Sequence, residues 1–479
     1  MRTVTNWIDG AECPGSLGVF EKLAPATGEP ISSVARSAAA DVDAAISAAV
    51  AAQPAWADRT VEERGRALRR ITQLLERDRE EIAAIVAEET GKSPKDARGE
   101  TDGAIELGYF MAGEGRRYYG RTLPSATPNR YAQTIRQPLG VAGLIIAANT
   151  PIANVAWKVF PALVCGNAAV LKASEDSPET ANAFMARAIE AGLPPGVLNI
   201  VHGFGEEAGQ PLVEDPRVAL VSFTGSTAVG RMIARVAGER LAKICLELGG
   251  KNPLVVCDDA SLEKAAEAAA LSAWSNAGQR CAAGSRIVVF DAVYDRVREL
   301  LVERAAAQRV GPTDDDDFGP VVNERQLDSM LSAVARARDA GATVVTGGTR
   351  LDRPGFFIAP TIVEGAAVDS EISTTELFGP ITTLHRVAGF EEALAVANAS
   401  PYGLTAAIWT SSIHRGQEFA RRIQAGGVQV NGPTYGFEPH VPFGGQKDSG
   451  TGWREPGTEA LDVYSDWKTI YVNHDPSQV

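Results

Sequence analysis

Cysteine and histidine are both scarce in this sequence, with five of each among 479 residues. No CxxC pair occurs, and the histidines are scattered rather than clustered with cysteines. This pattern argues against a zinc site and against a disulfide framework. We therefore expect no metal centre and a reducing compartment, the cytoplasm.

Basic charge and long apolar runs are scarce as well. The chain has 46 basic and 60 acidic side chains, a formal net charge of -14. A phosphate-backbone binder normally has a basic surplus, so nucleic acid is not expected as a partner, and an anionic membrane surface is disfavoured too. The longest apolar run, VAGLIIAA at 141–148, is too short to span a bilayer, and the N-terminus lacks the apolar segment of a signal peptide.

Short apolar runs alternate with helical patterns after residue 139, at 141–148, 168–173, 197–203 and 218–225. Such alternation predicts a doubly wound parallel α/β sheet, whose ligands bind at the carboxyl ends of the strands. A second α/β unit begins after Gly250, as expected for a chain too long for one core.

The two ends of the chain have patterns of their own. Residues 38–90 are rich in Ala, Glu and Arg at helical spacing, with Pro54 inside and Gly91 at the end, which predicts two or three surface-facing helices. The C-terminal LDVYSDWKTIYVNHD is strand-like and rich in aromatics. Because an unpaired strand is an aggregation hazard, we expect this segment to pair.

Three residues with catalytic potential follow predicted strands or lie in small-residue loops. Cys281, in WSNAGQRCAAGSR, has neither a partner nor an apolar wall in its local sequence, so it is a packing residue, a metal ligand or a nucleophile. Glu247, in LELGGKNP, is either a capping or salt-bridged acid or a general base with a raised pKa. Asn149, in AANTPIAN, is either a turn former or a donor to an oxyanion.

Two further motifs suit a dinucleotide. Lys172 and Glu175, in LKASED, follow a strand end, and Glu175 lies 27 residues beyond residue 148. That offset roughly suits a carboxylate that binds ribose hydroxyls, although a solvated loop acid would look the same. In FTGSTAVG, Gly225 permits a tight turn and Ser226 caps a helix N-terminus that favours phosphate, but an ordinary strand-to-helix turn has the same features.

Taken together, these motifs resemble the aldehyde dehydrogenase superfamily, the NAD(P)-dependent enzymes that oxidise aldehydes to acids. The resemblance covers nearly the whole chain, and ELGGK at 247–251 and GQRC at 278–281 are its most specific elements. It implies a Rossmann-like cofactor domain (1–118 and 138–248), an α/β catalytic domain (249–456) and a small β oligomerisation arm (119–137 and 457–479). The arm would make the protein a homodimer or homotetramer.

The resemblance also implies a covalent mechanism. Cys281 attacks the aldehyde, and Asn149 with the Cys281 backbone N–H holds the oxyanion. After hydride transfer, Glu247 activates water to hydrolyse the thioester, while Glu455 and Lys158 relay protons. NAD is expected rather than NADP, because Glu175 would repel a 2′-phosphate. The residues expected at the cofactor are Lys172, Glu175, Gly205, Gly225, Ser226, Leu248, Gln326, Glu376 and Phe378.

The substrate is the least determined point. Thr150 replaces the family's aromatic residue beside Asn149, which predicts a wide pocket, and Arg280 is the one cation evident near it. We therefore expect uncharged aromatic or medium-chain aldehydes. The alternatives are a carboxylated semialdehyde, a CoA-acylating reaction (against which Glu247 argues), a cysteine hydrolase without a matching histidine, and a non-catalytic protein that kept the fold. The expected pocket residues are Thr150, Trp157, Trp274, Arg280, Tyr435, Phe437 and Phe443.

Overall fold

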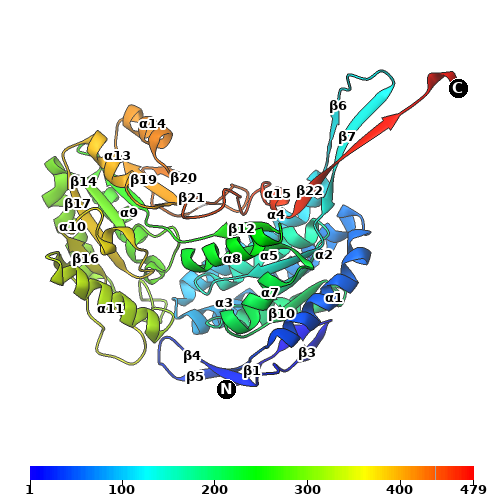
Figure 1. Ribbon diagram of the computed structural model, residues 1–479. Helices are drawn as coiled ribbons and strands as arrows, with labels where there is room; N and C mark the ends of the chain where they lie inside the picture. Colours follow the sequence, from blue (N-terminus) through cyan, green and yellow to red (C-terminus); the bar gives the residue numbers. More distant parts are fainter. Residues whose placement is uncertain (437, 479) are drawn as a thin grey trace.

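Two seven-stranded sheets build two lobes, and a narrow three-stranded arm projects from the first lobe (Figure 1). The computed structural model describes residues 1–436 and 438–478. Within these ranges, no helix has the length and apolar character needed to cross a membrane.

The first sheet has a parallel centre because its short apolar strands are buried on both faces and connected through helices. Its order is β12-β11-β8-β9-β10-β2-β3, with β2 and β3 antiparallel at one edge. The strands are β2 (Asn6–Ile8), β3 (Ala11–Cys13), β8 (Val141–Ile145), β9 (Ala168–Lys172), β10 (Leu198–Val201), β11 (Val218–Thr224) and β12 (Lys243–Glu247).

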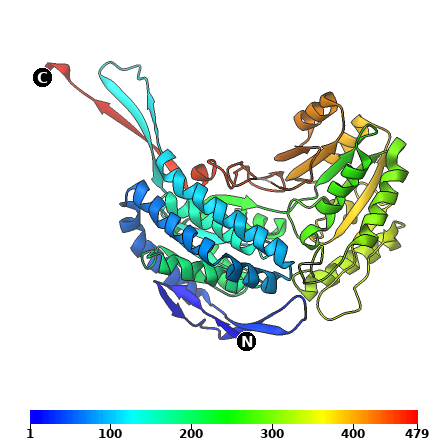
Figure 2. The ribbon, with the colours of Figure 1, turned by 180° about the vertical axis from the view of Figure 1, so that it is seen from behind.

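Helices cover both faces of this sheet, which is the predicted doubly wound arrangement. Helices α2 (Val61–Arg77), α4 (Pro94–Glu114), α5 (Pro151–Val164) and α6 (Pro178–Glu190) pack on one face. Helices α1 (Ala39–Ala57), α7 (Gln210–Glu214) and α8 (Thr227–Glu239) pack on the other. Seen from behind, the helices of residues 61–114, blue to cyan, lie over the first of these faces (Figure 2).

The predicted helical segment forms α1 (Ala39–Ala57), α2 (Val61–Arg77) and α3 (Arg79–Thr90), followed by α4 (Pro94–Glu114). The expectation of two or three helices is therefore confirmed. Gly91 ends α3 with a left-handed φ of 76°, and a Cβ there would lie 2.5 Å from Pro320 Cγ. Only glycine suits both the conformation and the close approach.

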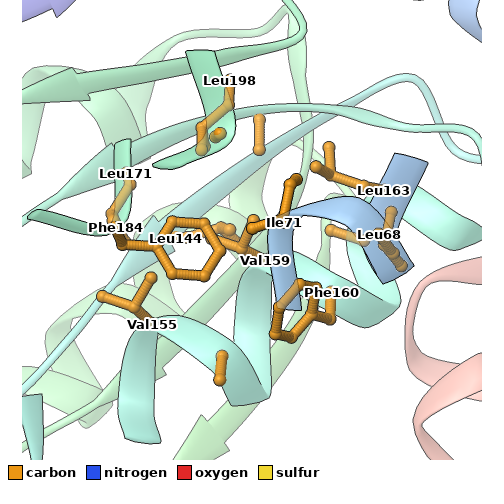
Figure 3. Packing of buried hydrophobic residues seen from close by; sticks show 14 of the residues in the cluster. Leu68, Ile71, Leu144, Val155, Val159, Phe160, Leu163, Leu171, Phe184 and Leu198 are labelled. Atoms are coloured by element: carbon orange, nitrogen blue, oxygen red, sulfur yellow. The ribbon is translucent and has the colours of Figure 1, made fainter. Parts of the chain in front are cut away.

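Between the sheet and this helical layer, leucine side chains from three strands pack against side chains of α5 and α2 (Figure 3). The labelled side chains are Leu144, Leu171 and Leu198 from the strands, Val155, Val159, Phe160 and Leu163 from α5, Leu68 and Ile71 from α2, and Phe184 from α6. This packing fixes α5, whose N-terminus follows the predicted oxyanion residue Asn149.

The second sheet has the order β15-β16-β17-β14-β13-β19-β20, with β15 antiparallel at one edge. Its strands are β13 (Pro253–Val256), β14 (Arg286–Phe290), β15 (Thr343–Thr346), β16 (Thr361–Glu364), β17 (Ile381–Val387), β19 (Thr405–Trp409) and β20 (Gly427–Val430). Its helices are α9 (Leu262–Trp274), α10 (Tyr294–Ala307), α11 (Glu324–Asp339), α12 (Glu371–Thr374), α13 (Phe390–Asn398) and α14 (Ile413–Arg422).

The arm consists of β6 (Arg121–Leu123), β7 (Arg130–Pro138) and the C-terminal β22 (Ser465–Asn473). Strand β22 runs antiparallel to β7 over its full length, so the prediction that the terminal strand is paired is confirmed. The smaller elements are β1 (Arg2–Val4), β4 (Val19–Leu23) and β5 (Pro30–Ala35), the pair β18 (Tyr402–Gly403) and β21 (Gln446–Lys447), and α15 (Ala460–Val463).

Candidate active site

Two adjoining cavities lie at the carboxyl ends of the first sheet's strands. The larger cavity, about 580 Å³, is lined by Lys172, Glu175, Gly205 and Gly225. The smaller cavity, about 360 Å³, is lined by Asn149, Glu247 and Cys281 together with Ser226, Leu248, Glu376 and Phe378. Residues Asn149, Gly225, Gln326 and Phe378 border both cavities, so the two adjoin, and we refer to them together as the groove.

The larger cavity has the features of a dinucleotide site. Lys172 Nζ donates to Glu175 Oε2 at 3.0 Å. Burial alone would raise the pKa of Glu175, but the charge of Lys172 lowers it below its ordinary value, so the carboxylate is ionised. Helix α8 begins beside this cavity, with the Ser226 hydroxyl accepting from Val229 N at 3.4 Å. A helix N-terminus favours a phosphate, and an ionised carboxylate accepts ribose hydroxyls.

Cys281 follows an unusual chain reversal. Asn276, Ala277 and Gly278 have consecutive left-handed φ values of 53°, 54° and 65°. A Cβ on Gly278 would lie 2.1 Å from the carbonyl oxygen of Gly379. Burial, followed by the negative charges of Glu376 and Glu247, raises the pKa of Cys281 to about 12. The thiol is therefore neutral and needs a base to accept its proton.

Asn149 is fixed against the Cys281 loop by hydrogen bonds on both its side chain and its backbone. Its Nδ2 donates to the Gln279 carbonyl at 3.1 Å, and its own carbonyl accepts from Lys92 Nζ at 2.8 Å and from Asn276 Nδ2 at 3.4 Å. Because an amide nitrogen has two N–H groups, the bond to Gln279 orients the amide and leaves a second donor.

A buried polar cluster lies behind Glu247. Glu455 accepts hydrogen bonds from Lys158 Nζ at 3.0 Å, Ser222 Oγ at 3.1 Å and Tyr464 Oη at 2.7 Å, and the ion pair with Lys158 is fully buried. Burial and then the charge of Glu455 raise the pKa of Glu247 well above its ordinary value. Sequence reasoning missed Ser222 and Tyr464, because neither lies in a motif that signals catalysis.

Glu376 and Phe378 close the groove from the second lobe. Glu376 Oε1 accepts from Gly250 N at 2.9 Å, and burial raises the pKa of this carboxyl to about 7. A Cβ on Gly250 would lie 2.3 Å from the Cys281 carbonyl oxygen, and a Cβ on Gly249 would lie 2.2 Å from Glu376 Oε2, so neither position of the pair in ELGGK has room for a side chain. Phe378 has a left-handed φ of 54°, a strained conformation that clusters at functional sites.

Aromatic side chains surround Cys281 on the far side of the smaller cavity. The rings of Trp157 and Phe443 pack edge to face at 5.7 Å, and Cys281 and Tyr435 contact the same cluster. The Arg280 guanidinium lies over the Tyr435 ring, with Cζ 4.8 Å from its centroid. Thr150, Trp157 and Phe443 line the cavity itself.

Three expected pocket residues, Arg280, Tyr435 and Trp274, are not among the residues that line this cavity. Arg280 and Tyr435 lie beside it, at the aromatic cluster. Trp274 is fully buried in the core of the second lobe, so its placement in the pocket is corrected. Trp274 is the last residue of α9, and the left-handed turn at 276–278 lies between it and Cys281. Phe437 lies outside the described residues. Among the residues that the structure does describe, no group of three or more His, Cys, Asp or Glu side chains is arranged to hold a metal.

Comparisons with known proteins agree with this geometry. Residues 13–470 match the model of the aldehyde dehydrogenase family, so the chain belongs to that family and is an oxidoreductase. It is 39% identical over 478 residues, 98% of each chain, to the alpha-ketoglutaric semialdehyde dehydrogenase of Bacillus subtilis (strain 168). It is 40% identical over 435 residues to the 2,5-dioxopentanoate dehydrogenase of Saccharolobus solfataricus, covering 90% of this chain and 91% of that relative.

Solved structures support the same assignment. Betaine aldehyde dehydrogenase from Staphylococcus aureus, in complex with NAD+, superposes with a TM-score of 0.96 at 32% identity. The superposition covers 98% of this chain and 95% of that one. The predicted family and the aldehyde dehydrogenase fold are thereby confirmed.

Proposed function

We propose that this protein oxidises a carboxylated aldehyde, a semialdehyde, to the corresponding diacid with NAD, through a thioester on Cys281. The observation that carries the proposal is the shared cavity. Asn149, Glu247 and Cys281 line one cavity, and it adjoins the larger cavity, which has the features of a dinucleotide site.

The first step forms a bond between Cys281 Sγ and the aldehyde carbon. The thiol proton passes to Glu247, and the carbonyl oxygen becomes an oxyanion. The free N–H of the Asn149 side chain and the Cys281 backbone N–H stabilise that charge. The carbonyl then re-forms as a hydride leaves the thiohemiacetal carbon, and NAD, when bound in the groove, would be the acceptor of that hydride.

Glu247 first passes the thiol proton to the Glu455 and Lys158 pair behind it, which restores its carboxylate. It then takes a proton from water, whose oxygen attacks the thioester carbon. The C–S bond breaks, which releases the acid and returns the Cys281 thiolate. Glu247 is suited to this role because it is buried and its Oε1 has no hydrogen-bond donor among the described residues. Glu455 and Lys158, directly behind it, carry the proton onward.

The cofactor preference follows from the charge of Glu175. An ionised carboxylate beside Lys172 accepts the two hydroxyls of an unmodified ribose but repels a 2′-phosphate. The NAD+ complex of the betaine aldehyde dehydrogenase supports the same choice. The groove residues expected from the sequence would hold this cofactor, with Ser226 near its phosphates.

The relatives favour a carboxylated substrate over the uncharged aldehydes that the sequence pattern suggested. Both curated relatives are named for a five-carbon 2-oxo acid that carries an aldehyde at its far end. Arg280 offers the matching charge. No ion pair involves it among the described residues, and its buried Nε has no hydrogen-bond partner there. A guanidinium so placed binds a carboxylate with two parallel hydrogen bonds.

The test compares kcat/KM for 2,5-dioxopentanoate and glutaric semialdehyde with kcat/KM for hexanal and benzaldehyde, each with NAD. We expect the carboxylated aldehydes to lead by at least about tenfold, and Arg280→Met to remove that lead while changing hexanal by less than about threefold. Arg336→Met is the control, because Arg336 lines the smaller cavity but pairs with Glu371. A preference for hexanal in the parent would refute the substrate proposal alone.

We also propose the domain division expected from the sequence, with the arm as the oligomer contact. Tyr131, Trp467 and Tyr471 are exposed apolar side chains on the arm, which a second copy of the chain would cover. Sedimentation of the parent and of a Tyr131→Ser/Tyr471→Ser variant tests this. We expect a dimer or tetramer for the parent and a smaller species for the variant; an unchanged sedimentation coefficient would contradict the proposal.

A further inference from the structure

A buried ion pair outside both cavities contacts the segment that carries Asn149. Lys92 lies between α3 and α4, and Glu100 lies on α4. Their side chains are only 3% and 5% exposed, and Lys92 Nζ pairs with Glu100 Oε2. Burying two charges costs desolvation energy, so a buried ion pair does not by itself stabilise a fold. The groups that this pair contacts therefore indicate its role.

Each member of the pair binds the backbone near the reacting centre. Lys92 Nζ donates to the Asn149 carbonyl at 2.8 Å. Glu100 Oε1 accepts from Ile152 N at 2.9 Å and from Ala153 N at 3.3 Å. These two amides belong to the first turn of α5, where backbone N–H groups have no partner within the helix. The pair therefore holds the chain on both sides of Thr150.

The turn that supplies Lys92 also contacts the catalytic lobe. Gly91 approaches Pro320 so closely that a side chain would not fit between them. The Pro320 carbonyl accepts from Gln279 Nε2 at 3.4 Å, and the Gln279 carbonyl accepts from Asn149 Nδ2 at 3.1 Å. The ion pair, the Asn149 amide and the Cys281 loop thus share one hydrogen-bonded junction.

We propose that Lys92 and Glu100 are positioning residues that keep the Asn149 amide aimed at the oxygen of the aldehyde bound to Cys281. This inference rests on the proposed function of Asn149 as an oxyanion donor. The other donor to the Asn149 carbonyl, Asn276 Nδ2, is at the longer distance of 3.4 Å, so Lys92 provides the closer contact. Oxyanion stabilisation depends steeply on donor position, so a small displacement of this segment slows the first chemical step.

The first measurement uses single-turnover NADH formation at saturating NAD, with the best aldehyde of the panel above. We expect Lys92→Met to slow this step roughly 10- to 100-fold, with NAD affinity within about twofold of the parent. Lys92→Met leaves the Glu100 charge buried without its partner, which destabilises the fold. The double variant Lys92→Met/Glu100→Gln removes both charges and therefore separates the effect on rate from the effect on stability. We expect that double variant to regain the parental unfolding midpoint and to remain slow.

The second measurement asks whether the effect passes through Asn149. In an Asn149→Ala background, which is itself slow, Lys92→Met should change the rate by less than about twofold. Glu89→Gln is the matched control: Glu89 accepts from the first-turn amides of α6, Glu179 N and Thr180 N, at 2.7 and 2.9 Å, far along the sequence from Asn149. We expect it to change stability but not the single-turnover rate.

The outcomes separate this inference from the proposed function. A parental rate in Lys92→Met/Glu100→Gln, or an equal loss from Lys92→Met with and without Asn149, would overturn the inference and leave the role of Asn149 intact. A parental rate in Asn149→Ala would overturn both.

Discussion

Removing the charge of Lys158 or of Glu455 is expected to move the pH profile of thioester hydrolysis in opposite directions. Burial and Glu455 raise the pKa of Glu247, whereas Lys158 and Arg454 lower it. Glu247 acts as a base only when deprotonated. Lys158→Met therefore shifts the rise in rate to higher pH, and Glu455→Gln shifts it to lower pH.

The size of the shift follows from the strand geometry. Lys158 Nζ lies 2.7 Å from Ser222 Oγ, and Ser222 is in register with Cys245 on the neighbouring strand. Glu247 is two residues further along, on the same face, so strand spacings place the Lys158 charge about 8 Å from it. At an effective dielectric constant of about 20, that separation corresponds to about 2 kcal/mol, or about 1.5 pKa units.

The assay is the decay of the acyl group on Cys281, followed by rapid quench and mass spectrometry between about pH 6 and about pH 10. The double variant Lys158→Met/Glu455→Gln removes both charges and should return to within about half a unit of the parental profile. Lys243→Met, at the opposite end of β12, is the control and should not shift it. Unmoved profiles, or shifts of the same sign in the two single variants, would refute the electrostatic argument.

Three further predictions concern the groove. Cys281→Ala should lower turnover by at least about 10³-fold while leaving NAD binding intact by titration, and residual activity well above that level would remove the nucleophile assignment. Glu175→Gln should lower the ratio of kcat/KM with NAD to kcat/KM with NADP by about tenfold, because the charge that repels the 2′-phosphate is lost. An unchanged ratio would show that another group distinguishes the two cofactors. Gly278→Ala should lower both the unfolding midpoint and activity, because its φ is +65° and its Cβ would meet the Gly379 carbonyl; parental values for both would contradict this.

Much of the fold is readable from local pattern. The end of α3 at Gly91, and the apolar runs that became β8 to β11, depend on the periodicity and turn chemistry of a few consecutive residues. Pro54, by contrast, lies inside α1 and does not end it. Trp274 shows where such reasoning fails. It was expected to form an aromatic wall of the pocket, but it is buried with α9 in the core of the second lobe. The left-handed turn at 276–278, which no local pattern specified, separates it from Cys281.

The candidate site also contains residues that the sequence predicted and residues that it did not. Cys281, Glu247 and Asn149 lie in motifs, and the structure brings all three to one cavity. The residues behind them do not lie in motifs. Tyr464 reaches Glu455 from the junction with the arm, and Lys92 reaches Asn149 across 57 residues of sequence. Such contacts are fixed by the packing of α4, α5 and β22, which a single sequence does not reveal.

The central claim is that an acyl group is carried on Cys281 and released by water that Glu247 activates. Mass spectrometry of Glu247→Gln, mixed with NAD and the best aldehyde, tests it most directly. The account predicts a burst of NADH equal to the enzyme concentration, followed by slow turnover, and an acyl adduct on the peptide that contains Cys281. Parental steady-state turnover with an unmodified Cys281 peptide would contradict it.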